Sequence, residues 1–141
     1  MAFMFEKLEV YQKAVSLSAE IAELTQSFPR GYYFLTDQLN RAALSIATNL
    51  AEGNGRFTKP DRKNFFTIAR GSVQECVPLL EVARRRGLVD ESKHQSLRQD
   101  LEIIAKMISG LIGGLDRRGS PAAREQVSSG TGEQVKSRSP R

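Results

Sequence analysis

Five polar side chains recur at spacings of three and four residues between positions 38 and 52, inside a stretch otherwise rich in Leu, Ile and Ala. In an α-helix this spacing places all five on one narrow face. Such a face suits a catalytic or ligand-binding groove, or else a hydrogen-bond network that fixes helix register or seals a subunit interface. Because no second carboxylate lies within a helical turn of the glutamate, we favour the network. The five residues are Gln38, Arg41, Ser45, Asn49 and Glu52.

Buried members of this line need partners, because an unpaired buried polar group costs about 1–3 kcal/mol. Arg41 and Glu52 lie about 16 Å apart along a helix axis, so they do not pair with each other. A third helix that folds back just after the second brings residues 71–75 opposite Arg41. We therefore expect a buried contact of Arg41 with Glu75 and Ser72. Glu52 is expected to meet the start of the third helix, through its backbone N–H groups or a lysine there.

Cationic side chains cluster from this turn into the third helix, and Lys59, Lys63 and Arg70 share one face. Together with the helix N-terminus they form the best anion-facing surface of the folded part. Nucleic-acid phosphates suit this surface, although a solvated helix face has the same composition. Lys59 and Lys63 are also the lysines that could meet Glu52. The candidate nucleic-acid-binding residues are Arg56, Lys59, Arg62, Lys63 and Arg70.

Signatures of enzymes and metal sites are missing from the sequence. His94, the only histidine, would have to serve any metal site or Ser-His-Asp triad alone. Cys76 lies on the apolar face of the third helix and is predicted to be part of the core. The segment EGNGRF at 52–57 lacks the Gly-Lys-Ser/Thr ending of a phosphate loop and follows a helix, not a strand. We therefore predict no catalytic residue, metal or cofactor.

Apolar residues recur every three or four positions in four segments, the period of amphipathic helices. The second segment carries only three charged residues over twenty positions, which predicts a helix buried on several sides. Thr58 and Asp90 are candidate N-caps, and Gly87 is a candidate C-terminal stop. Pro78 lies inside the third segment and should kink it near Gln74. The expected helices span about 5–27, 35–54, 58–87 and 90–115.

Short connections between long helices make neighbours antiparallel, which predicts an all-α, up-down-up-down four-helix bundle over residues 1–115. Gly53, Asn54 and Gly55 are expected to end the second helix. The first two helices carry more apolar surface than a closed bundle needs, so we expect a homo-oligomer that covers it. Residues 116–141 are rich in Gly, Ser, Pro and charge, which predicts a disordered basic tail.

The net charge of +5 is unevenly distributed. Residues 1–115 hold 15 Lys and Arg against 13 Asp and Glu, whereas residues 116–141 hold 6 against 3. The folded part is therefore close to neutral, and basicity alone is weak evidence for nucleic-acid binding. One cysteine, no secretory signal and no long apolar run indicate a cytoplasmic protein without a membrane span.

Several segments within residues 3–115 together resemble a known family. The most specific are SI-x-x-N-x-AEG, from Ser45 to Gly53, and A-x-GS-x-x-E, from Ala69 to Glu75; Phe5, Leu8, Tyr11, Phe28–Pro29 and Gly55–Arg56 accompany them. They are similar to bacterial four-helix bundle proteins encoded in intervening sequences of 23S ribosomal RNA genes. That family is related to the accessory variability determinant of diversity-generating retroelements.

The resemblance implies a ring-like homopentamer without enzymatic activity. For the retroelement relatives it also implies binding of nucleic acid and of a reverse transcriptase. The leading hypothesis is therefore an oligomeric bundle that binds RNA or DNA through phosphate contacts. The alternative is an oligomeric scaffold that binds a protein, such as a reverse transcriptase, without contacting nucleic acid. The folded part is less basic than the retroelement proteins, and Pro78 lies where the family has an uninterrupted helix.

Overall fold

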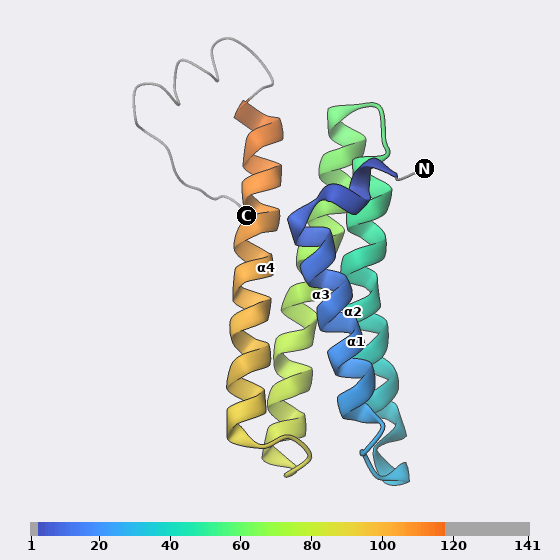
Figure 1. Ribbon diagram of the computed structural model, residues 1–141, viewed down its shortest axis with the longest axis vertical. Helices are drawn as coiled ribbons and strands as arrows, with labels where there is room; N and C mark the ends of the chain where they lie inside the picture. The colour runs from blue at the N-terminus through green and yellow to red at the C-terminus, as the bar shows by residue number, and fades with distance from the viewer. Residues whose placement is uncertain (1–2, 118–141) are drawn as a thin grey trace.

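The described part of the chain forms four long helices and two short 3-10 turns (Figure 1). The computed structural model describes residues 3–117, and this range contains no β-strand. The first helix is preceded by a 3-10 turn, and a second such turn leads into the next helix. In chain order the elements are η1 (Met4–Lys7), α1 (Glu9–Thr25), η2 (Arg30–Tyr32), α2 (Tyr33–Asn54), α3 (Lys59–Arg85) and α4 (Glu91–Arg117).

Local hydrogen bonds explain where α3 begins and ends and where α4 begins. The Thr58 hydroxyl accepts a bond from the backbone N–H of Asp61 at 3.3 Å. Gly87, with φ of +77°, lets the N–H groups of residues 87 and 88 bond the carbonyls of residues 84 and 83, which forms a Schellman motif. The Asp90 carboxylate accepts from the N–H of Lys93 at 2.7 Å. The predicted helix signals at Thr58, Gly87 and Asp90 are confirmed.

The apolar stripes of all four helices meet in one core, as the sequence predicts. Cys76 belongs to this core and is fully buried. Burial, with a smaller contribution from the nearby charge of Glu75, raises the pKa of the Cys76 thiol to about 12. The largest buried side chains include Leu17, Ile21, Leu39, Ile46, Leu50, Leu80, Leu101, Ile104 and Ile108.

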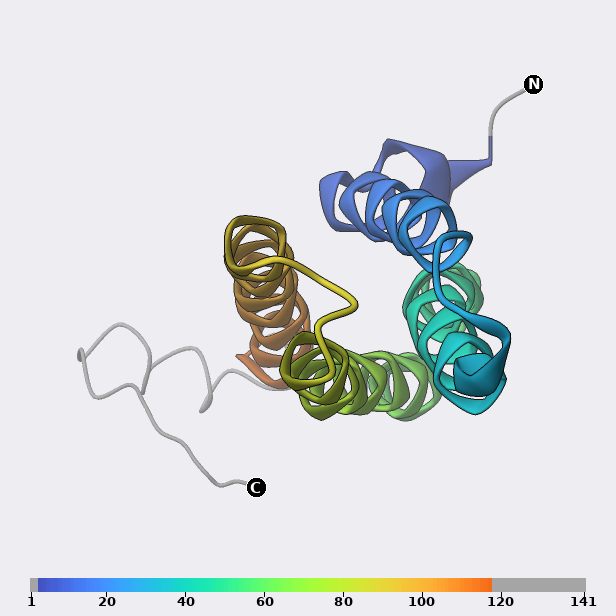
Figure 2. The same ribbon diagram turned by 90° about the horizontal axis from the view of Figure 1, so that it is seen from below.

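Seen along the bundle, the four helices follow one another around an open arc (Figure 2). α2 packs against both α1 and α3, and α3 also packs against α4; the contact between α1 and α4 is smaller. The outer side of α2 faces solvent, with Phe34 62% and Leu44 56% exposed. α2 is therefore covered by its two neighbours and is open on its outer side.

Gly53 allows α2 and α3 to pack closely beside the turn that joins them. A Cβ atom at this position would lie 2.8 Å from Cε1 of Phe66 and 3.0 Å from Cβ of Phe65. Gly53 is buried inside α2, which continues to Asn54. The expected end of the second helix at Asn54 and Gly55 is confirmed. The structure adds that the missing side chain of Gly53 serves packing against α3.

Other details differ from those expected. α1 spans Glu9–Thr25 instead of about 5–27, because Met4–Lys7 form the separate 3-10 turn η1, and α2 begins at Tyr33 instead of about 35. α3 continues through Pro78 as one helix, and the predicted kink near Gln74 stays a prediction. α4 includes Asp116 and Arg117, which were assigned to the tail; the rest of the predicted tail, residues 118–141, lies outside the described residues. Among helices of the described part, none has the length and apolar character to cross a membrane.

Candidate nucleic-acid interface

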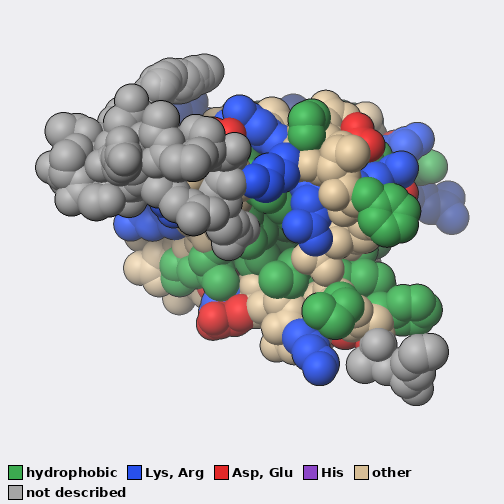
Figure 3. Space-filling view, turned by 90° about the horizontal axis from the view of Figure 1, so that it is seen from above, with side chains coloured by type: hydrophobic (Ala, Val, Ile, Leu, Met, Phe, Trp, Pro, Cys, Tyr) green, Lys and Arg blue, Asp and Glu red, His purple; other side chains and the backbone are tan. Residues whose placement is uncertain are grey.

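Cations gather at the end of the bundle where α2 turns into α3. Arg56 lies in the turn itself, and Lys59, Arg62 and Lys63 follow in the first two turns of α3. We call these four residues the basic turn. Figure 3 looks onto this end of the molecule and shows Lys and Arg side chains gathered beside exposed hydrophobic ones.

Arg56 is held on two sides within the turn. Its Nη2 donates to the Glu52 carboxylate at 2.6 Å, and its guanidinium carbon lies 4.6 Å from the centre of the Phe65 ring. The side chain still remains 42% exposed. Glu52 was expected to meet Lys59, Lys63 or the helix N–H groups, but it pairs with Arg56 because that residue lies one helical turn further on.

Arg62 braces the turn and faces solvent less than the other three. Its Nη2 donates to the carbonyl oxygen of Asn54 at 3.1 Å, and this carbonyl, at the end of α2, has no acceptor role inside the helix. Its Nε is buried and has no hydrogen-bond partner among the described residues. Arg62 therefore fixes the geometry in which its neighbours are presented.

Lys63 and Arg70 lie on the side of α3 that faces α4. The Lys63 ammonium is 3.1 Å from the Asp116 carboxylate, and Nη1 of Arg70 donates to the Ser109 hydroxyl at 3.3 Å. Exposed ion pairs of this kind contribute about 0–1 kcal/mol, so a phosphate group can replace the carboxylate at little cost. Lys59, the first residue of α3, is exposed beside the helix N-terminus, where backbone N–H groups favour anions.

Of the five polar residues singled out on α2, Ser45 is the one whose hydrogen bond reaches α3. The hydroxyls of Ser45 and Ser72 are 2.8 Å apart, and Nδ2 of Asn49 donates to the Ser45 hydroxyl at 3.0 Å and to its carbonyl at 2.8 Å. Ser72 also donates to the carbonyl of Ile68 at 3.2 Å. The bond between Ser45 and Ser72 links the two helices midway along their length, where Ser72 is buried, and the other bonds lie within one helix.

The charged members of the line take no part in that contact. The expected buried contact of Arg41 with Glu75 and Ser72 is wrong: the Arg41 side chain is 72% exposed and pairs with Asp37 at 3.3 Å. Both Glu75 and Gln38 are exposed as well. Arg41 points outward from the α2–α3 pair, where a carboxylate one turn away on its own helix is the available partner.

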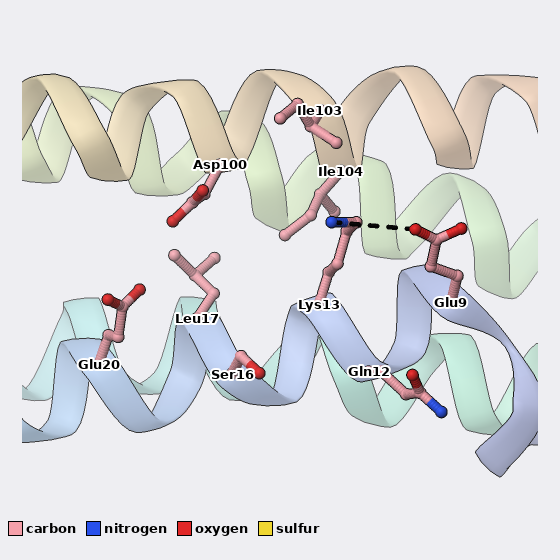
Figure 4. A pocket seen from close by; sticks show the side chains of 9 residues that line it. All are labelled: Glu9, Gln12, Lys13, Ser16, Leu17, Glu20, Asp100, Ile103 and Ile104. Atoms are coloured by element: carbon pink, nitrogen blue, oxygen red, sulfur yellow. Dashed lines mark ion pairs between the residues drawn. The ribbon is translucent and has the colours of Figure 1, made fainter.

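An acidic groove of about 380 Å³ lies between α1 and α4 (Figure 4). Glu20 and Asp100 point toward it from opposite sides, and Leu17 and Ile104 form part of its apolar lining. Burial, and then the charge of Glu20, raise the pKa of Asp100 above its ordinary value. Carboxylates repel phosphate, so this groove does not extend the basic turn.

A second cluster lies at the opposite end of α3. Hydrogen bonds from Arg84 and then Arg85 lower the pKa of Glu81 to about 2. The Nε2 atom of the buried His94 is 3.5 Å from Glu81, whereas its Nδ1 is buried without a hydrogen-bond partner in the described part of the chain. Arg84 also lies 3.5 Å from Glu91. Glu81 therefore holds both Arg84 and Arg85 at the C-terminal end of α3.

Two features of the surface could not be predicted from the sequence patterns. The acidic groove combines residues of α1 and α4 that are about 90 positions apart in the chain. Phe57, in the α2–α3 turn, is 101% exposed, and neither motif nor periodicity singles it out. Among residues 3–117 there is no group of three or more His, Cys, Asp or Glu that could hold a metal ion.

Comparison with known proteins places this arrangement in a family. A solved structure from Bacteroides thetaiotaomicron, described as a protein of unknown function from the S23 ribosomal protein family, has a similar fold with a TM-score of 0.68. It is 21% identical, and the match covers 73% of this chain and 97% of that one. No curated protein matches the chain. The model of the 23S rRNA-intervening sequence proteins matches residues 6–110, and the chain therefore belongs to this family.

Proposed function

We propose that the protein is a non-enzymatic, cytoplasmic homo-oligomer of up-down-up-down four-helix bundles that binds RNA or DNA through backbone phosphates at the basic turn. The observation that carries the proposal is the gathering of Arg56, Lys59 and Lys63 around the N-terminus of α3, at one end of the bundle. Cations and helix N–H groups that converge in this way attract anions, and phosphate groups are among them.

The four cations of the basic turn face three exposed carboxylates, Glu52, Asp61 and Asp116, so the proposal depends on how weakly these carboxylates hold the cations. Arg56 and Lys63 each have one exposed carboxylate partner, with side chains 42% and 49% exposed. Such pairs are weak in water, so a phosphodiester can compete for both cations. Because Arg62 already braces the turn, forming the contact requires little ordering of the backbone.

Self-association would multiply this modest charge. The outer surface of α2 and α3 carries exposed apolar side chains, among them Leu44, Ile68 and Val82, which a monomer would leave in water. We propose that copies of the chain associate, as a pentamer if the family resemblance holds for assembly, and so present several basic turns together. Simultaneous contacts would then raise the overall affinity well above that of one turn.

The same apolar surface supports the second candidate function. An oligomeric scaffold could use it to bind a protein partner, such as a reverse transcriptase, without contacting nucleic acid. Exposed apolar side chains such as Leu44 and Ile68 are a kind of surface that protein interfaces bury. Under this alternative, changes at the basic turn leave partner binding intact.

The test is fluorescence anisotropy of a labelled RNA or DNA strand titrated with the full chain at several salt concentrations. Replacing Lys59 and Lys63 by Ala should lower the slope of log affinity against log salt by about 1.4, since each lost single-strand contact removes about 0.7. The matched control replaces Arg86 and Arg98, two exposed cations elsewhere, and keeps the slope. No binding at low salt, or equal losses in both double variants, would refute the proposal.

A further inference from the structure

Phe57 is an aromatic side chain without a structural role in the described chain. It is 101% exposed and lies directly before Thr58, the N-cap of α3. An apolar residue at this position often packs against the fourth residue of the helix. That residue here is Arg62, whose guanidinium is bound to Asn54 instead. Neither packing in the core nor an apolar contact at the start of α3 therefore explains why the turn exposes a phenylalanine ring to water.

The backbone on both sides of Phe57 is fixed. Before it, the N–H groups of Gly55 and Arg56 bond the carbonyls of Glu52 and Gly53, both at 3.2 Å. After it, the Thr58 cap bonds Asp61. The ring is thus carried on a short, braced loop at the tip of the bundle, so ligand binding needs little ordering of the backbone there.

Cations flank the ring on both sides in the chain. Arg56 precedes it directly, and Lys59 follows two residues later, with Lys63 one helical turn beyond. An aromatic face between cations is the arrangement that binds unpaired nucleotides, because the ring stacks on a base while the cations contact the adjoining phosphates. A duplex keeps its bases stacked inside, so it offers phosphates to the cations but no free base to the ring.

We infer that Phe57 is a stacking platform for an unpaired base, so that the basic turn prefers single-stranded nucleic acid to a duplex. The inference rests on the proposed function and names the class of nucleic acid that the site takes. Single-stranded RNA and single-stranded DNA both present the groups that this site would bind, namely an exposed base next to two phosphates. Phe57 acts as a binding residue that touches the ligand, whereas Arg62 acts only by positioning the turn.

The chain has no tryptophan, which makes the test direct. Replacing Phe57 by Trp introduces a single fluorophore at the proposed contact, and stacking on a base should quench it. The probes are a twelve-nucleotide oligouridylate, the oligodeoxyuridylate with the same bases and a blunt duplex of equal length, each added to the full chain. Quenching by both single strands and not by the duplex supports the inference; quenching by only one of them identifies the sugar that the site accepts.

Affinity gives an independent measurement. Loss of one base stacked on an aromatic ring weakens binding by about 5- to 150-fold, so Phe57→Ala should lower single-strand affinity by that factor. Its duplex affinity and the salt dependence should stay as in the wild type. Phe34→Ala is the matched control, since Phe34 is 62% exposed at the far end of α2. Because Phe57 is fully exposed, Phe57→Ala should fold normally.

The possible failures are distinguishable. If the wild type binds no nucleic acid, both this inference and the proposed function fail. If the lysine variants weaken binding but Phe57→Ala does not, or weakens single-strand and duplex binding equally, only the stacking inference fails. If Phe57→Ala lowers the mass measured by light scattering, the ring is a contact between copies of the chain and the inference is overturned.

Discussion

Replacing Gly53 by Ala tests whether the close packing of α2 on α3 beside the basic turn is required. The added Cβ would lie 2.8 and 2.9 Å from two ring atoms of Phe66 and 3.0 Å from Cβ of Phe65. The Phe66 ring is only 4% exposed and has little room to rotate, and Cβ of Phe65 moves only with the backbone of α3. Overpacking of this kind costs about 1–3 kcal/mol.

Gly71→Ala provides the matched control inside α3. No atom lies within 4 Å of the Cβ that it would add, so only the gain in helix propensity remains, about 0.5–1 kcal/mol. Because this gain is common to both variants, their free energies of unfolding should differ by about 1–3 kcal/mol, with Gly71→Ala the more stable. Gly110→Ala, also in open surroundings, should behave like Gly71→Ala.

The assay is urea unfolding of each variant followed by circular dichroism at 222 nm, at one protein concentration so that any association is equal. Thermal unfolding should show the same order, with a gap of at least about 4 °C between the Gly53 and Gly71 variants. A Gly53→Ala protein as stable as Gly71→Ala would refute the claim that the α2–α3 contact leaves no room for a methyl group. It would also weaken the case for a rigid turn.

Three further predictions concern single side chains. Ser72→Ala removes the 2.8 Å contact with Ser45 and should destabilise the fold by about 1 kcal/mol, measured by urea unfolding. Since burial raises the pKa of Cys76 to about 12, iodoacetamide at pH 8 should label it, as read by mass spectrometry, only after denaturation. Hydrogen bonding, mainly by Arg84, lowers the pKa of Glu81 from 4.5 to about 2. The ionised Glu81 carboxylate therefore stabilises the fold fully above pH 4.5, and this contribution is lost as the pH falls toward 2. Glu81→Gln should make the free energy of unfolding less dependent on pH in that range, measured by circular dichroism.

The four helices could be predicted from sequence because their signals are local. Thr58, Gly87 and Asp90 act through backbone bonds to residues three to five positions away, and these bonds follow from residue type alone. The apolar stripes likewise depend only on helical period. The packing role of Gly53 could not be predicted in this way, because the side chains that approach it, Phe65 and Phe66, lie on another helix.

The candidate site was less predictable, because it depends on which way each side chain points. The turn-based estimate put Arg41 opposite residues 71–75, and the Ser45–Ser72 contact places it opposite about residue 76. The register was therefore nearly correct. The pairing with Glu75 was still wrong, because Arg41 lies on the outer side and pairs within its own helix. Periodicity identifies the buried face of a helix well, but it does not tell which polar residues face a neighbouring helix and which face solvent.

The basic turn, too, could be predicted only in part. Charge spacing identified its cations, but only the structure separates Arg62, which braces Asn54, from the exposed lysines. Phe57 carries no pattern at all, since one aromatic residue in a turn has no period and no motif. Its significance comes from an exposure of 101% beside those cations.

The central claim is that nucleic acid contacts the α2–α3 turn, and photocrosslinking tests it most directly. The full chain is irradiated with a single-stranded RNA that contains 4-thiouridine, and the crosslinked peptides are identified by mass spectrometry. We predict crosslinks within residues 55–70, the segment that holds Phe57 and the basic turn. Crosslinks confined to other segments, such as the α1–α4 groove or residues 118–141, or no crosslink at all, would contradict the claim.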